Sequence, residues 1–159
     1  MLVVDIRNAS GLSTGKSNLH SIQVKDKNES LKITLVWTDP AAELSAGKAL
    51  VNDLDLVVVS PGGATYRGNF NFLGGFSQPQ SEPVAADPNN VEMVIVAAPD
   101  PGTWNLRVEG RAINVELQGL CTSRFLFHKR TMGAELVSNS LIPYCQRIFF
   151  GGNHLLSIR

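Results

Sequence analysis

The sequence predicts an all-β protein, an antiparallel, jelly-roll-like β-sandwich of about seven to eight strands. Short runs rich in β-branched residues alternate apolar with polar side chains, and clusters of Gly, Pro, Asn or Asp bound each run. No amphipathic helical period and no internal repeat occurs before residue 118. The chain has 159 residues, 43% of them apolar and 18% charged, so it is long enough to bury one core.

The first two predicted strands lie at residues 20–25 and 31–38. HSIQVK (20–25) alternates and is followed by a polar turn, whereas LKITLVWT (31–38) is largely apolar and β-branched. The second run ends at Asp39-Pro40, because proline supplies no backbone donor and restricts the residue before it. Trp37 falls within this run, and we expect it to pack in the core.

The middle of the chain contains a predicted hairpin followed by a long loop. DLDLVVVS (53–60) reads as a strand that ends at a Pro-Gly-Gly turn, and residues 64–67 form its short partner. Residues 68–90 are rich in Gly, Pro and Asn and read as a loop. A loop of this length in a compact domain is usually functional or held down by other contacts.

Two further strands are predicted after this loop, at residues 91–97 and 103–110. TWNLRVEG (103–110) places Trp104, Leu106 and Val108 on one face, which we expect to be buried. Residues 112–117 are predicted to form one more strand.

The net charge is zero but unevenly distributed. Residues 1–117 carry 9 Lys and Arg against 13 Asp and Glu, whereas residues 118–159 carry 5 against 1. This shift predicts a boundary near residue 118. We therefore divide the chain into a linker (1–17), a sandwich (18–117) and an atypical, poorly packed tail (118–159). Zero net charge argues against a nucleic-acid partner, and no apolar run is long enough to span a membrane.

Several of these runs, taken together, resemble a known domain. LKITLVWTDP (31–40), LVNDLDLVVVSPGGATYRGN (50–69) and NNVEMVIVAAPDPGTWNLRVEG (89–110) occur in order and at suitable spacing. They are similar to the C-terminal β-sandwich, or jelly-roll, domain of subtilisin-like (subtilase, S8 family) serine proteases. The resemblance covers about residues 3–117, and residues 3–17 resemble the segment that leaves the protease domain.

The resemblance implies a non-catalytic accessory domain of a secreted serine endopeptidase. Such a domain packs on an upstream catalytic domain, stabilises it and helps to position protein substrates. The chain contains none of the triad motifs of that catalytic domain and no secretion signal, so proteolysis and an extracellular location are expectations for the parent protein.

The family pattern stops near residue 115, where a closing strand is expected. Some codon choices for residues 119–125 encode the missing strand when the DNA is read one base later. We therefore hypothesise a frameshift near residues 115–119. The coding DNA would test this hypothesis. The alternative is a native extension, in which RFLFHK (124–129) substitutes as a strand and CQRIFFGG (145–152) forms another.

Calcium is the expected cofactor. Asp53 and Asp55 are two residues apart, so on a strand both carboxylates face one side, where they repel unless a cation bridges them. Calcium prefers such oxygen ligands, and family members bind it in or near this domain. The alternative is that Asp53 caps a turn and Asp55 is solvated. The full predicted ligand set is Asp53, Asp55, Asn69, Asp87, Asn90 and Glu92.

Aromatic residues around the long loop form a second candidate site. They either pack beneath the loop or form an apolar surface that meets a protease domain or a substrate. These residues are Tyr66, Phe70, Phe72 and Phe76.

We expect no catalytic residues in this chain. His20 opens a strand and is expected at the surface, and no nucleophile elbow or phosphate-binding loop is present. Cys121 and Cys145 lack the spacing of a zinc site.

There are two alternatives to the protease accessory domain. One is a free-standing carbohydrate- or protein-binding sandwich, which exposed aromatic residues on a sheet face would favour. The other is a calcium-clamped adhesion domain.

Overall fold

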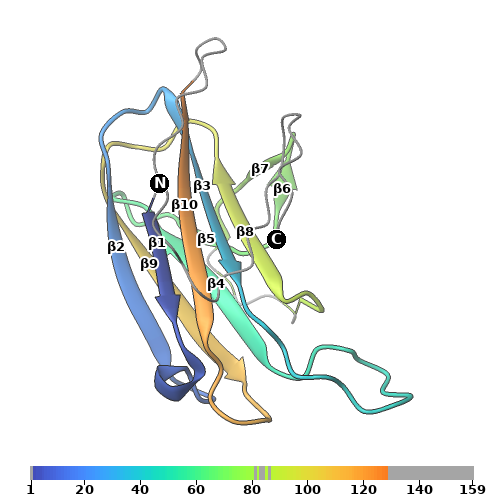
Figure 1. Cartoon of the computed structure of the whole chain (residues 1–159). Coiled ribbons are helices and arrows are strands. Elements are labelled where there is room, and N and C mark those ends of the chain that lie inside the picture. The colour runs from blue at the N-terminus through green and yellow to red at the C-terminus, as the bar shows by residue number, and fades with distance from the viewer. Residues whose placement is uncertain (1, 81, 83–84, 86, 129–159) are drawn as a thin grey trace, which may run out of the picture.

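Two four-stranded antiparallel sheets pack face to face, and a small hairpin lies beside them (Figure 1). The structure, a computed structural model, describes residues 2–80, 82, 85 and 87–128. One sheet has the strand order β1-β10-β3-β8 and the other has the order β2-β9-β4-β5. The predicted antiparallel sandwich is confirmed, whereas the narrower jelly-roll assignment stays a prediction.

The strands are short and their bounds follow the turn signals in the sequence. The first sheet contains β1 (Leu2–Ile6), β10 (Leu120–His128), β3 (Glu29–Val36) and β8 (Val91–Val96). The second contains β2 (Ser17–Val24), β9 (Gly102–Ala112), β4 (Asp53–Val59) and β5 (Thr65–Arg67). The hairpin consists of β6 (Phe72–Leu73) and β7 (Phe76–Ser77), and a single 3-10 turn, η1 (Asn8–Ser10), follows β1. The described residues include no helix able to cross a membrane.

The core is built from the inward rows of both sheets. Leu31, Ile33 and Leu35 of β3 have no exposed surface, and they belong to one core cluster with apolar residues of the neighbouring β8 and of β4 and β9 in the other sheet. The two predicted core tryptophans are confirmed, since Trp37 is 3% exposed and Trp104 is 1% exposed. Each indole N–H is satisfied by a nearby carbonyl, as buried tryptophan requires: Trp37 Nε1 donates to Asn52 O at 2.9 Å and Trp104 Nε1 to Asp100 O at 2.8 Å.

The predicted strand at residues 112–117 is wrong. β9 ends at Ala112, and the backbone N–H groups of Asn114 and Val115 donate to Asn52 Oδ1 at 2.8 and 3.1 Å. Asn52 is 1% exposed and its Nδ2 donates in turn to Val115 O at 2.9 Å. A buried side chain therefore replaces a neighbouring strand as the partner of this segment.

The sandwich extends past both ends of the predicted range 18–117. β10 pairs with β1 on one side, from Leu2 opposite Arg124 to Ile6 opposite Leu120, and with β3 on the other side. A strand with neighbours on both sides is an integral part of its sheet, because both rows of its backbone groups are paired.

Residues 124–128 lie within β10, so this part of the tail forms the substitute strand that the native-extension alternative expects, while the origin of the tail stays a prediction. Lys129 and residues 145–152 lie outside the described residues. The frameshift remains a hypothesis about the coding DNA.

Candidate functional site

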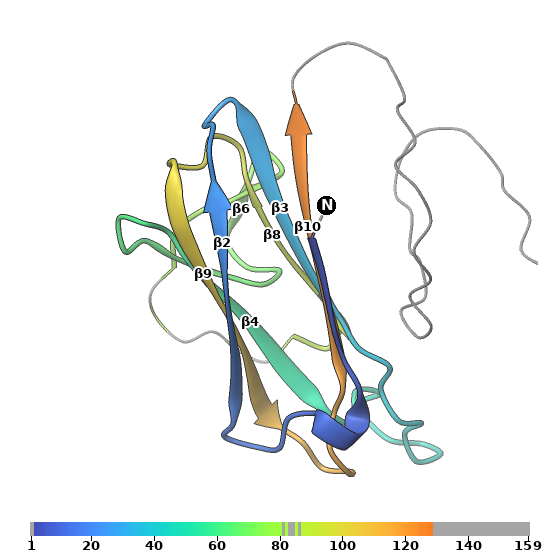
Figure 2. The same ribbon diagram turned by 60° about the vertical axis from the view of Figure 1, so that its left-hand side comes forward.

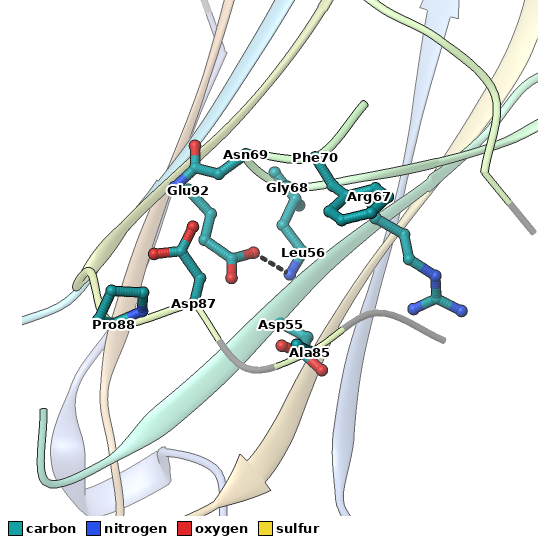
Figure 3. A pocket seen from close by; sticks show the side chains of 10 residues that line it. All are labelled: Asp55, Leu56, Arg67, Gly68, Asn69, Phe70, Ala85, Asp87, Pro88 and Glu92. Atoms are coloured by element: carbon teal, nitrogen blue, oxygen red, sulfur yellow. Dashed lines mark hydrogen bonds between the residues drawn. The ribbon is translucent and has the colours of Figure 1, made fainter. Parts of the chain in front are cut away.

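The main candidate site is a pocket of about 220 Å³ at one open side of the sandwich (Figure 3). Here β8, the outer strand of one sheet, approaches β4 of the other sheet just beyond the end of β5. The pocket is lined by Asp55, Leu56, Arg67, Gly68, Asn69, Phe70, Ala85, Asp87, Pro88 and Glu92.

Glu92 is the central residue of this pocket. Strand alternation places it in the same inward row of β8 as Val94 and Val96, and it is only 3% exposed. Its Oε2 accepts a 2.6 Å hydrogen bond from the backbone N–H of Leu56 in the opposite sheet. β5 ends at Arg67, opposite Val57, so Leu56 lies just past the last paired residue. The Glu92 carboxyl group thus takes the place of the missing strand partner.

Gly68 makes room for this arrangement. Its N–H donates to Leu56 O at 2.9 Å, which completes the backbone pairing of Leu56. A Cβ atom at Gly68 would lie 2.7 Å from Glu92 Cβ and 2.9 Å from its carboxyl carbon, closer than real side chains approach. The close packing of Glu92 therefore requires glycine at this position.

Two carboxyl groups of the pocket, Asp55 and Glu92, have raised pKa values. The pKa of Glu92 is raised to about 8: burial is the largest cause, the bond from Leu56 N acts against it, and the nearby Asp55, Asp87 and Asp53 add to the rise. Burial also raises the pKa of Asp55, although Arg111 lowers it through a 3.3 Å contact of Nη1 with Asp55 Oδ2. In Figure 3 the Asp55, Asp87 and Glu92 side chains lie on one side, and Arg67 points away from them.

Four of the six predicted calcium ligands line this pocket: Asp55, Asn69, Asp87 and Glu92. The amide of Asn69 is already occupied, because its Nδ2 donates to Val91 O at 2.7 Å and its Oδ1 accepts from Met93 N at 3.0 Å. Asn69 therefore attaches the loop to β8.

The other two predicted ligands, Asp53 and Asn90, do not line the pocket. Asp53 is 4% exposed and its Oδ2 lies 3.4 Å from Lys48 Nζ, while Asn90 Nδ2 donates to Trp37 O at 3.0 Å. A bulge between Asp53 and Leu54 interrupts the alternation on which the paired-carboxylate argument rested. Within the described ranges, no three Asp, Glu, His or Cys side chains gather closely enough to hold a metal ion.

The four aromatic residues of the second predicted site separate into two groups. Tyr66 is partly buried and its ring centroid lies 5.7 Å from that of Trp104, so it packs as part of the core. Phe70, Phe72 and Phe76 are 40%, 41% and 39% exposed. These three, together with Leu73 at 71% exposure, are the exposed apolar side chains on and beside the hairpin, and we call them the hairpin surface.

The hairpin itself was missed by the sequence analysis, which treated residues 68–90 as a loop. Gly74 and Gly75 have φ values of 58° and 85°, which suit the two-residue turn that joins β6 to β7. A Gly-Gly pair between apolar residues is the signal that predicts such a turn. The backbone role of Glu92 was also missed, since the sequence suggested only a metal ligand.

Comparison with known proteins finds a similarity to a small region of one large protein. No family model matches it. Over 111 residues, 67% of this chain, it is 29% identical to the serine protease/ABC transporter B family protein tagA of Dictyostelium discoideum. The matched part is 6% of that much longer protein. The chain is thus similar to a small region of a protein named for a serine protease.

We predict that Glu92→Gln flattens the pH dependence of stability. Since the pKa of Glu92 is about 8 in the folded state against an ordinary 4.5, the folded state binds more protons between these values. The contribution of Glu92 to the free energy of unfolding is therefore fully present below pH 4.5. It decreases as the pH rises through 8, by at most about 1.4 kcal/mol per pH unit. Glutamine keeps an acceptor for Leu56 N but does not ionise.

Urea unfolding at pH 5, 6.5 and 8 measures this effect. The variant should gain stability relative to the wild type as the pH rises. A smaller pH dependence of stability should remain in the variant, because the pKa of Asp55 is also raised. Glu82→Gln, at an exposed position, is the matched control and should leave the slope unchanged. An unchanged slope in Glu92→Gln would contradict the role of burial.

We predict that Gly68→Ala destabilises the fold by about 1–3 kcal/mol, because a methyl group would overlap Glu92. Gly62→Ala is the matched control, since a Cβ there would meet only Ser60 Oγ at 3.9 Å. Equal free energies of unfolding for the two variants, from urea titrations, would show that the packing of Glu92 is not tight.

Proposed function

We propose that this chain is a non-catalytic accessory β-sandwich of a subtilisin-like serine endopeptidase, and that it packs on and stabilises the catalytic domain. The observation that carries the proposal is the 111-residue similarity to a protein named for a serine protease. The all-β fold agrees with the accessory domain that the sequence motifs resemble. The hydrolysis belongs to the parent protein, which we place outside the cell.

The hairpin surface is the part of the domain that we propose contacts the catalytic domain or a protein substrate. The hairpin is attached to β8 at both of its ends. Asn69, before β6, bonds to β8, and Ser77 Oγ, at the end of β7, accepts a 3.0 Å hydrogen bond from Ile95 N. Exposed apolar side chains on a fixed backbone lose little conformational entropy on binding. This supports docking through Phe70, Phe72, Leu73 and Phe76.

A carbohydrate-binding module receives less support. Sugar recognition by stacking needs exposed aromatic residues on a sheet face, but Trp37 and Trp104 are buried. The exposed aromatic residues lie instead on and beside the hairpin β6–β7.

Calcium binding is a separate part of the proposal. The support is that three carboxyl groups, of Asp55, Asp87 and Glu92, line one pocket and that the pKa values of Asp55 and Glu92 are raised. A cation in the pocket would offset the repulsion between these carboxylates, but binding would have to draw the three side chains closer together, because among the described residues no such group is already close enough to hold a metal ion. Asp53, Asn69 and Asn90 are left out of this narrower ligand set, because their side chains have other contacts.

The protease proposal predicts that the DNA upstream of this reading frame encodes, in frame, a subtilisin-like domain with its Asp, His and Ser triad. The purified chain should bind that domain and slow its thermal inactivation, as measured by residual casein hydrolysis. The double substitution Phe72→Ser and Leu73→Ser should weaken binding at least about tenfold, by loss of buried apolar area. Leu44→Ser is the control, since Leu44 is 97% exposed and lies far from the hairpin in the sequence.

Casein hydrolysis by the purified chain alone, blocked by a serine-protease inhibitor, would overturn the non-catalytic assignment. A different domain encoded upstream would overturn the protease connection itself.

The calcium proposal predicts a higher melting temperature in calcium than in chelator. A ligand at 100 times its dissociation constant adds about 2.7 kcal/mol when it binds only the folded state. Asp87→Asn should remove the shift, and Asp26→Asn, in a separate turn, should keep it. No shift at millimolar calcium would eliminate the site and leave the protease proposal unaffected.

A further inference from the structure

We infer that β2 is a pairing edge through which two copies of this chain join their sheets. Each sheet ends in two outer strands, which are β1 and β8 in one sheet and β2 and β5 in the other. An outer strand exposes unpaired backbone N–H and C=O groups, and proteins usually shorten, cover or charge such edges. The four edges of this sandwich differ in this respect.

Two of the edges are covered by other parts of the chain. Along β8, the Asn69 amide bonds to Val91 O and Met93 N, and Ser77 Oγ bonds to Ile95 N. β5 has only three residues, and Gln80 N donates to Thr65 O at 2.6 Å. A third edge, β1, has only five residues. None of these three offers a long free edge.

β2 is the exception. It has eight residues and pairs with β9 without a register shift, from Ser17 opposite Glu109 to Val24 opposite Gly102. Its sequence, SNLHSIQV, contains no Pro, Lys, Arg, Asp or Glu that would discourage a further strand. Figure 1 shows β2 at the left margin of the sandwich, with β9 as its neighbour in the sheet.

The alternation of hydrogen bonds shows which residues face this open edge. Gly110 N donates to Lys16 O at 2.9 Å, so the carbonyl group of Lys16, just before β2, points toward β9. In an antiparallel ladder every second residue bonds to the same neighbour, so the even-numbered residues of β2 bond to β9. The N–H and C=O groups of Ser17, Leu19, Ser21 and Gln23 therefore point to the open edge. No backbone bond joins them to another segment of the described residues.

A second copy of the chain is complementary to this edge. An antiparallel two-fold pairing with Ser21 opposite Ser21 places Leu19 opposite Gln23. The backbone N–H and C=O groups that point to the open edge of one copy then meet those of the other copy. It also keeps the even-numbered row of β2, with Ile22 and Val24, on the core side of both copies. Lys25 meets Ser17 of the partner copy, so no like charges oppose each other. The result is a continuous sheet through both sandwiches.

The inference does not depend on the proposed protease role. β2 and β5 lie at opposite ends of their sheet, so dimerisation through β2 leaves the pocket and the hairpin surface free. A single strand pair buries less than the roughly 1,200 Å² of a stable interface, so we expect a weak dimer at high protein concentration.

Charge substitution at the two-fold axis tests the inference on the full chain. Ser21→Lys and Ser21→Glu should each weaken dimerisation at least about fivefold in sedimentation equilibrium, because two like charges then face each other. An equal mixture of the two variants should restore the dimer, since Lys then meets Glu. Ser10→Lys, at an exposed position outside both sheets, is the matched control and should dimerise like the wild type.

Amide hydrogen exchange provides a second measurement that needs no variant. On dilution, the amides of Leu19, Ser21 and Gln23 should exchange faster, whereas those of His20 and Ile22, which bond to β9, should not change. A wild-type chain that stays monomeric at millimolar concentration would overturn the inference. It would also be overturned if the mixed variants failed to recover dimerisation.

Discussion

A carboxyl group buried between the two sheets determines the geometry of the candidate site. β5 ends before it reaches Leu56, and an unpaired N–H group in the interior would cost about 1–3 kcal/mol. Glu92 supplies the missing acceptor from the opposite sheet, and Gly68 leaves the space that its side chain needs. The raised pKa of Glu92 is the consequence, because an acid that satisfies a buried donor must itself be buried.

The two sides of the sandwich are suited to different contacts. At one side, the pocket and the hairpin surface present acidic and apolar groups on a backbone that is attached to β8. At the other side, β2 presents free backbone groups and few charges. The proposed docking of a catalytic domain and the proposed pairing of two copies therefore use different surfaces.

The position of β10 explains how a segment outside the family pattern completes the sheet. β10 lies between β1 and β3 and bonds to both through its backbone. Backbone hydrogen bonds are the same for every residue except proline, and residues 120–128 contain no proline. A strand of unrelated sequence can therefore occupy this place.

The sequence by itself determined the central strands, their inward rows and the burial of both tryptophans, because alternation and turn residues act over a few neighbours. It placed Asp55, Asn69, Asp87 and Glu92 among the site residues, but it also included Asp53 and Asn90. Only the tertiary structure decided that a bulge and a lysine separate Asp53 from the pocket. Likewise, only long-range pairing revealed residues 2–6 and 120–128 as strands and Asn52 as the partner of residues 114–115. The physical reason is that strand pairing and pocket geometry depend on segments far apart in the chain, which no local pattern encodes.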